Sequence, residues 1–109
     1  MTINARIIAA LATLGIPVSF QAYKGAATTY ATFFIYLTQG EAWSEDVEDI
    51  TGYYVQLDVW SKGDNTAVVI LAKSLMLSAG FKRTNEVDLY EADTITYHKG
   101  MRFFYAEEI

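Results

Sequence analysis

The chain has 109 residues and contains no cysteine, one proline and one histidine. Without cysteine it forms no disulfide and no thiolate metal site. The single histidine, His98, lies in a predicted strand, and no G-x-S-x-G motif accompanies it. Serines and carboxylates are present, so a Ser-His-Asp geometry stays open, but no motif supports it. Phosphate-binding loops are also absent. We therefore expect no enzyme and no cofactor.

Long apolar runs are missing as well. The stretch AVVILAKSLML is too short to cross a bilayer and contains Lys73. Near the N-terminus, Arg6 and the apolar IIAALATLGIPV resemble a secretory signal. Only one positive charge precedes that run, however, and no small-x-small cleavage site follows it. We expect neither a membrane segment nor a cleaved leader.

Basic residues are few, with 8 Lys and Arg against 13 Asp and Glu, for a net charge of -5. This sign opposes adhesion to nucleic acid or anionic lipid, although a smooth pore through which DNA slides would tolerate it. Hydrophobic residues make up 52% of the chain and aromatic residues 15%. A single small domain, residues 1–109, with this much apolar material is expected to bury part of it against other subunits.

Periodicity predicts two helices and five strands in the order α-β-β-β-α-β-β. Helical spacing covers residues 3–14, with Ile8 widening the apolar stripe, and residues 66–79; glycine follows each helix. Alternating apolar and polar residues, or many β-branched and aromatic residues, predict strands at 18–23, 28–38 and 53–61 and two more between Phe81 and Ile109. We expect a bend or bulge at Gly100 in the last strand. The simplest packing is an α+β fold: a twisted, mostly antiparallel sheet of about five strands with both helices on one face.

The segment YVQLDVWS, residues 54–61, has two contrasting faces. Val55, Leu57 and Val59 form a core face. The other face carries two large aromatic residues around an amide and a carboxylate. Aromatic residues are enriched in interface cores. We therefore expect a subunit interface on this face, with the residues Tyr36, Trp43, Tyr54, Gln56, Asp58 and Trp60.

Residues 39–50, QGEAWSEDVEDI, are the most polar part of the chain and are predicted to form a protruding loop. They contain the carboxylates of Glu41, Glu45, Asp46, Glu48 and Asp49. A solvated loop and a contact with basic residues of another subunit both remain open. Ca²⁺ binding is poorly supported, because the D-x-D-x-D-G spacing is missing.

The order of these features resembles the small tail-completion proteins of long-tailed phages, also called tail terminators or tail-to-head joining proteins. The resembling parts, spread over nearly the whole chain, are LGIPVSFQAY, TYATFFIYL, YYVQLDVWSKGDN and AGFKRTNEVDLYEADTITYHKGMRFFY. The pattern D-x-W-S before a helix is Asp58-Trp60-Ser61 here, and a tyrosine-histidine pair before the final strand is Tyr97-His98.

The resemblance implies an α+β subunit of a homo-oligomeric ring in the neck or tail of a phage or prophage virion, assembled in the cytoplasm of the bacterial host. The ring is expected to be a hexamer. Such a ring caps the tail tube and docks to the head connector or head-closure protein, and DNA passes through its centre without specific binding. The acidic residues of the 39–50 segment are then expected to face the channel or the tail tube. Alternatives are another neck or tail subunit, such as a head-closure or tail-tube protein, and a small ligand-binding or hydrolytic domain.

Overall fold

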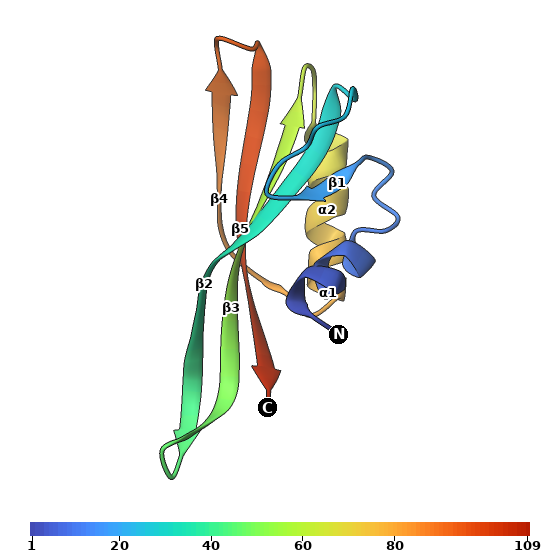
Figure 1. Ribbon diagram of the computed structural model, residues 1–109. Coiled ribbons are helices and arrows are strands. Elements are labelled where there is room, and N and C mark those ends of the chain that lie inside the picture. The colour runs from blue at the N-terminus through green and yellow to red at the C-terminus, as the bar shows by residue number, and fades with distance from the viewer.

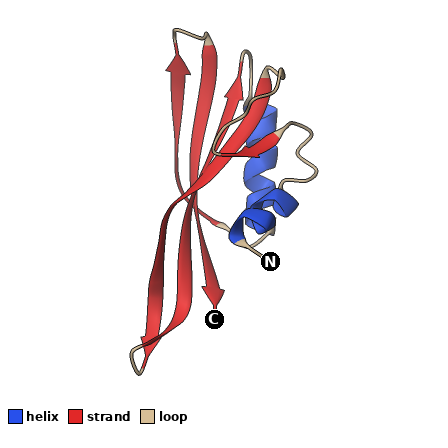
Figure 2. Cartoon of the chain, viewed as in Figure 1, coloured by secondary structure: helices blue, strands red, loops and turns tan.

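The computed structural model describes all 109 residues and has the predicted α+β architecture. Figures 1 and 2 show one twisted sheet with both helices packed on the same face. The strand order is β1-β2-β3-β5-β4; β1 is parallel to β2, and all other neighbours are antiparallel. The elements are α1 (Ile3–Ala10), β1 (Val18–Phe20), β2 (Thr29–Ser44), β3 (Val47–Ser61), α2 (Thr66–Ser78), β4 (Lys82–Glu91) and β5 (Thr96–Glu108).

The core lies between the helices and one face of the sheet. The predicted core residues Val55, Leu57 and Val59 are fully buried there. The helices contribute a stripe that includes Ile7 and Met76, both also without exposed surface. Burying each large apolar side chain contributes about 1.5–3 kcal/mol before the entropy of ordering it is subtracted. This single core fixes which face of the sheet the helices cover.

The helix ends follow local rules, but α1 is shorter than predicted. Thr2 caps it by accepting a hydrogen bond from the Ala5 N–H at 3.1 Å. Regular helix ends at Ala10, and irregular turns carry Leu14 into the core before Gly15 reverses the chain at φ +85°. Ile8 is 51% exposed, so its predicted place in the buried stripe was wrong.

The predicted loop at residues 39–50 was also wrong, because β2 and β3 continue through it as a hairpin. The strands pair as far as Ser44 and Val47, and a two-residue turn joins them. Both turn residues, Glu45 and Asp46, have positive φ, which gives the backbone the twist that such hairpin turns need. We call residues 37–54 the arm; it extends well below the helices in Figure 1. The sequence of the arm tip shows no alternation of apolar and polar residues, because water surrounds the tip on both faces.

The bulge predicted at Gly100 in the last strand is absent. Gly100 pairs in register with Asp58 on β3 and Val87 on β4, and the irregularity in β4 falls instead at Thr84. A Cβ on Gly100 would lie 3.2 Å from the Asp58 Oδ1. The glycine therefore leaves room for the Asp58 carboxylate on the open face of the sheet.

Neither helix has the length and apolar character needed to cross a membrane.

Candidate interaction surface

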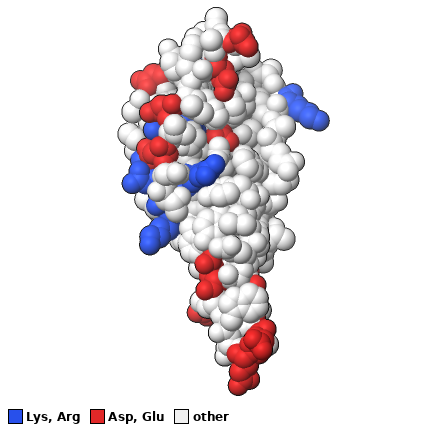
Figure 3. All heavy atoms as spheres, turned by 90° about the vertical axis from the view of Figure 1, so that its left-hand side faces the viewer, with Lys and Arg blue, Asp and Glu red and all other residues white.

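The sheet face turned away from the helices has no second layer over it (Figure 1). Strand alternation places Tyr54, Gln56, Asp58 and Trp60 on this open face, since their neighbours Val55, Leu57 and Val59 point into the core. Pairing with β5 adds His98, Arg102 and Phe104 to it. Figure 3 views the molecule from this side and shows a largely uncharged middle region above an acidic lower end.

A buried aspartate–histidine pair, Asp58 and His98, lies on this open face. The His98 Nε2 and the Asp58 Oδ1 are 2.7 Å apart, and the two side chains are 9% and 7% exposed. Gln56 donates a second hydrogen bond to the same carboxylate oxygen, at 2.9 Å. The Trp60 indole stacks on the imidazole with 3.8 Å between ring centroids. The face thus buries a carboxylate without help from the helices.

The other contacts of His98 and Trp60 hold neighbouring strands together. The Trp60 Nε1–H donates to the Thr32 Oγ1 at 3.0 Å, which joins β3 to β2. The His98 Nδ1 is buried without a hydrogen-bond partner and lies 3.6 Å from the Glu91 carboxylate on β4. Neither ring nitrogen bonds to a hydroxyl group. The Asp58–His98 pair therefore has a structural role, because it fixes the side chains around it on the open face.

An aromatic cluster occupies the part of the open face nearest the arm. The rings of Tyr36, Tyr54 and Phe104 lie in sequence, with centroid distances of 6.1 and 4.9 Å. The Arg102 guanidinium lies 4.5 Å from the centre of the Tyr36 ring, and its Nε–H donates to the Gln56 Oε1. Tyr36 is 37% exposed, although the chain supplies it with these partners. We call Tyr36, Tyr54, Phe104 and Arg102 the aromatic patch.

The structure separates the six predicted interface residues into three groups. Gln56, Asp58 and Trp60 are used mainly within the chain, in the network around His98. Tyr36 and Tyr54 belong to the aromatic patch. Trp43 lies apart from both groups, near the end of the arm, and is 62% exposed.

The five predicted acidic residues all lie on the arm, between Glu41 and Asp49. Figure 3 shows acidic side chains gathered at the lower end of the view. The Glu41 Oε1 accepts hydrogen bonds from the Tyr54 hydroxyl at 2.7 Å and from Gln39. The hydrogen bond to Glu41 raises the pKa of Tyr54, because it favours the protonated phenol. Nowhere in the chain do three carboxylate or imidazole groups come together as a metal ion would require.

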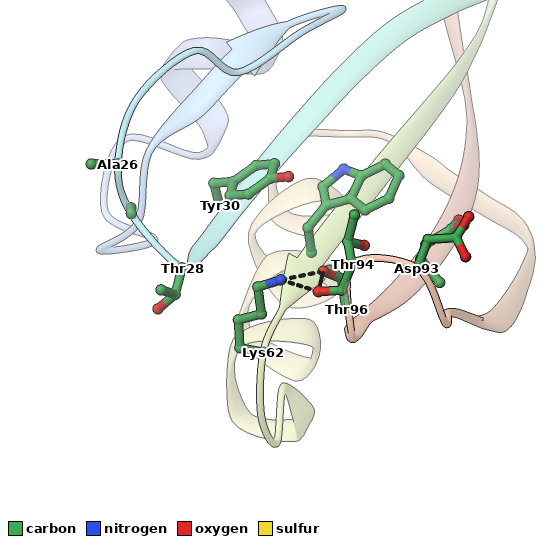
Figure 4. A pocket seen from close by; sticks show the side chains of 10 residues that line it. Ala26, Thr28, Tyr30, Lys62, Asp93, Thr94 and Thr96 are labelled. Carbon is green, nitrogen blue, oxygen red and sulfur yellow. Dashed lines mark hydrogen bonds between the residues drawn. The ribbon is translucent and has the colours of Figure 1, made fainter.

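A hollow of about 680 Å³ lies at the other end of the sheet, and sequence reasoning missed it. Figure 4 shows Tyr30 on one side and Asp93 on the other. Lys62 reaches between them and donates to the Thr94 carbonyl and, at 3.0 Å, to the Thr96 Oγ1. Trp60 and Glu91 also line it. The lining residues come from three separate chain segments, so no local motif marks the site.

No protein-family model matches this chain, and no curated protein matches it.

Proposed function

We propose that the protein is a tail-completion, or tail-terminator, subunit of a phage or prophage. In this role copies of the chain form a ring, expected to be hexameric, that caps the tail tube and joins it to the head connector or head-closure protein. DNA passes through the central channel without specific binding. The protein belongs to the virion neck or tail and assembles in the host cytoplasm.

One observation carries the proposal beyond the sequence resemblance: the aromatic patch lies on a sheet face that no element of the chain covers. Tyrosine, phenylalanine and arginine are enriched in interface cores, where large rings bury area at low entropic cost. A face of this composition is suited to contact with a neighbouring protomer. The net charge of -5 is compatible with a lumen that must not hold DNA.

Two other functions account for part of the same geometry. A head-closure or tail-tube subunit would need a similar uncovered face. A small ligand-binding domain is favoured by the hollow between Tyr30, Trp60 and Asp93, since binding pockets combine aromatic walls with a few polar groups. The hollow does not include His98, the only imidazole of the chain.

Deletion of the gene from the phage or inducible prophage that encodes it tests the proposal. We expect filled heads and unjoined tails to accumulate, and purified protein added to the unjoined tails to bind their head-proximal ends and restore joining, as seen by electron microscopy. Normal virion yield without the gene, or failure of the purified protein to bind those tails, would contradict the proposal.

A further inference from the structure

The charge of this protein is divided unevenly between the arm and the rest of the molecule. Residues 37–54 contain five carboxylates and no lysine or arginine. The remaining eight carboxylates match the eight basic side chains, so the entire net charge of -5 lies on the arm. Figure 3 shows this separation, with the basic residues well above the acidic end.

The arm carboxylates find no cation within the chain. All the ion pairs of lysine and arginine go to carboxylates outside the arm: Arg6 pairs with Glu107, and Lys73, Arg83 and Lys99 pair with Glu86. Glu45, Asp46 and Asp49 accept no side-chain hydrogen bond. Their charge is therefore available to an outside partner.

The arm also exposes an apolar anchor. Trp43 and Glu48 are register partners across the hairpin. The side chains of both residues lie close to Gly40, where a Cβ would come within 2.6 Å of the Trp43 indole and of the Glu48 carboxylate. Because Gly40 has no side chain, the indole rests against the backbone of the arm and remains 62% exposed. A held but uncovered tryptophan among carboxylates is unusual for a surface that meets only water, since tryptophan buries the largest apolar area of any side chain.

We propose that the end of the arm is a docking element for a partner protein of different sequence, whose surface offers an apolar recess for Trp43 framed by lysine and arginine side chains. A second copy of this chain fits poorly, because only Lys24 and Lys82 remain without an ion pair or side-chain hydrogen bond. DNA is disfavoured by charge of the same sign. For the identity of the partner this inference rests on the proposed function, under which it is the tail-tube protein.

Unjoined tails from the gene-deletion phage are the probe, and cosedimentation measures binding. Trp43→Ala is expected to weaken binding at least tenfold, as loss of a central anchor does. The triple variant E45Q/D46N/D49N keeps the hydrogen bonds of Glu41 and Glu48 but removes three charges. It is expected to weaken binding at low salt and to lose most of the salt dependence of the wild-type protein.

Matched controls lie on distant surfaces. Ile70→Ala removes another exposed apolar side chain, on α2, and Asp93→Asn removes a carboxylate at the opposite end of the sheet. Both are expected to bind like the wild type. Circular dichroism melting of all variants should match the wild type, because the residues changed are outside the core.

The outcomes separate this inference from the proposed function. If the wild-type protein binds tails and the arm variants bind equally well, the inference is overturned and the proposed function stands. If the arm variants lose self-association or bind DNA instead, the arm is a subunit contact or a channel element, and the inference is also overturned. If the wild-type protein does not bind tails, the proposed function fails, and the partner named here fails with it.

Discussion

At the scale of single residues, the most informative feature is the Asp58–His98 pair on a sheet face without a covering layer. The carboxylate is buried by its own neighbours: Trp60 stacks on the imidazole, Gln56 donates a hydrogen bond, and Gly100 leaves the space. Trp60 is therefore part of the packing of the monomer. Trp60→Ala would disturb this network, which makes it a poor probe of assembly.

The pair predicts a measurable loss of stability. His98→Ala removes the hydrogen bond to a buried carboxylate and the stacking surface of Trp60, and is expected to lower the free energy of unfolding by about 2–4 kcal/mol. Urea denaturation measures it. Glu91→Gln, which changes only the half-exposed carboxylate 3.6 Å from the His98 Nδ1, is the control and should cost less than about 0.5 kcal/mol. A loss below about 1 kcal/mol in His98→Ala would show that the pair is not structural.

At the scale of elements, the contact between α2 and the β4 edge of the sheet depends on a carboxylate that three cations share. The Glu86 side chain on β4 lies within 2.9–3.2 Å of Arg83, Lys73 on α2 and Lys99 on β5. Hydrogen bonds from Arg83 and then Lys73 lower the pKa of Glu86 from its ordinary 4.5 to about 2. Burial alone would lower the pKa of Lys99, but hydrogen bonds to Asp88 and Glu86 outweigh it and raise this pKa.

The lowered pKa of Glu86 predicts how stability depends on pH. Because the folded pKa lies below the unfolded one, the ionised form favours folding; this contribution is complete above about pH 5 and is lost as the pH falls from 4.5 toward 2. Allowing for the 21% exposure of the side chain, we expect Glu86→Gln to cost about 1–2 kcal/mol at pH 7. Urea denaturation of both proteins between pH 7 and 3 should show the difference shrinking below pH 4.5. A difference that does not vary with pH would contradict the ionic origin.

At the scale of the whole molecule, a compact helix-covered body continues into a narrow arm, and the extents are 52 × 26 × 23 Å. The aromatic patch lies where body and arm meet, on the uncovered face, whereas the helices shield the opposite face. One side of this elongated shape is thus suited to neighbours of the same kind, and its acidic end is suited to a different partner.

This arrangement predicts that a charge in the aromatic patch impairs assembly more than folding. Tyr54→Lys is expected to weaken self-association at least tenfold, because it removes a ring from the aromatic patch and places there an ammonium group that an interface would have to desolvate. The free energy of unfolding is expected to fall by less than about 1.5 kcal/mol. Light scattering over a concentration series measures association. If the free wild-type protein is monomeric, assembly of the protein on unjoined tails is measured instead of light scattering.

Leu71→Lys, at a 42% exposed position on α2, is the control for Tyr54→Lys and should assemble normally. If Tyr54→Lys unfolds the monomer by several kcal/mol, the patch belongs to the core of the chain. If it assembles like the wild type, the interface lies elsewhere.

Much of the architecture could be predicted from the sequence, because the spacing of apolar residues indicates which face of each element is buried. The stripe of α2 and the alternation of Val55, Leu57 and Val59 predicted the core and its helix-covered face, and the order of elements predicted the α+β class. The helix ends were also marked in the sequence, since the glycines that follow the two helices, Gly15 and Gly80, adopt positive φ.

Other features exist only in three dimensions. Glu45 and Asp46 form the tight turn of the hairpin. The strands next to this turn are solvated on both faces, so their sequence shows no apolar alternation that would predict the hairpin. Asp58 and His98 are forty positions apart and meet through strand register, which single-chain periodicity does not encode. The sequence alone therefore determined which face of the central strand and of α2 packs in the apolar core, because this burial leaves a local pattern. The tertiary structure decided which polar groups meet and where the net charge lies, because pairing between distant strands leaves none.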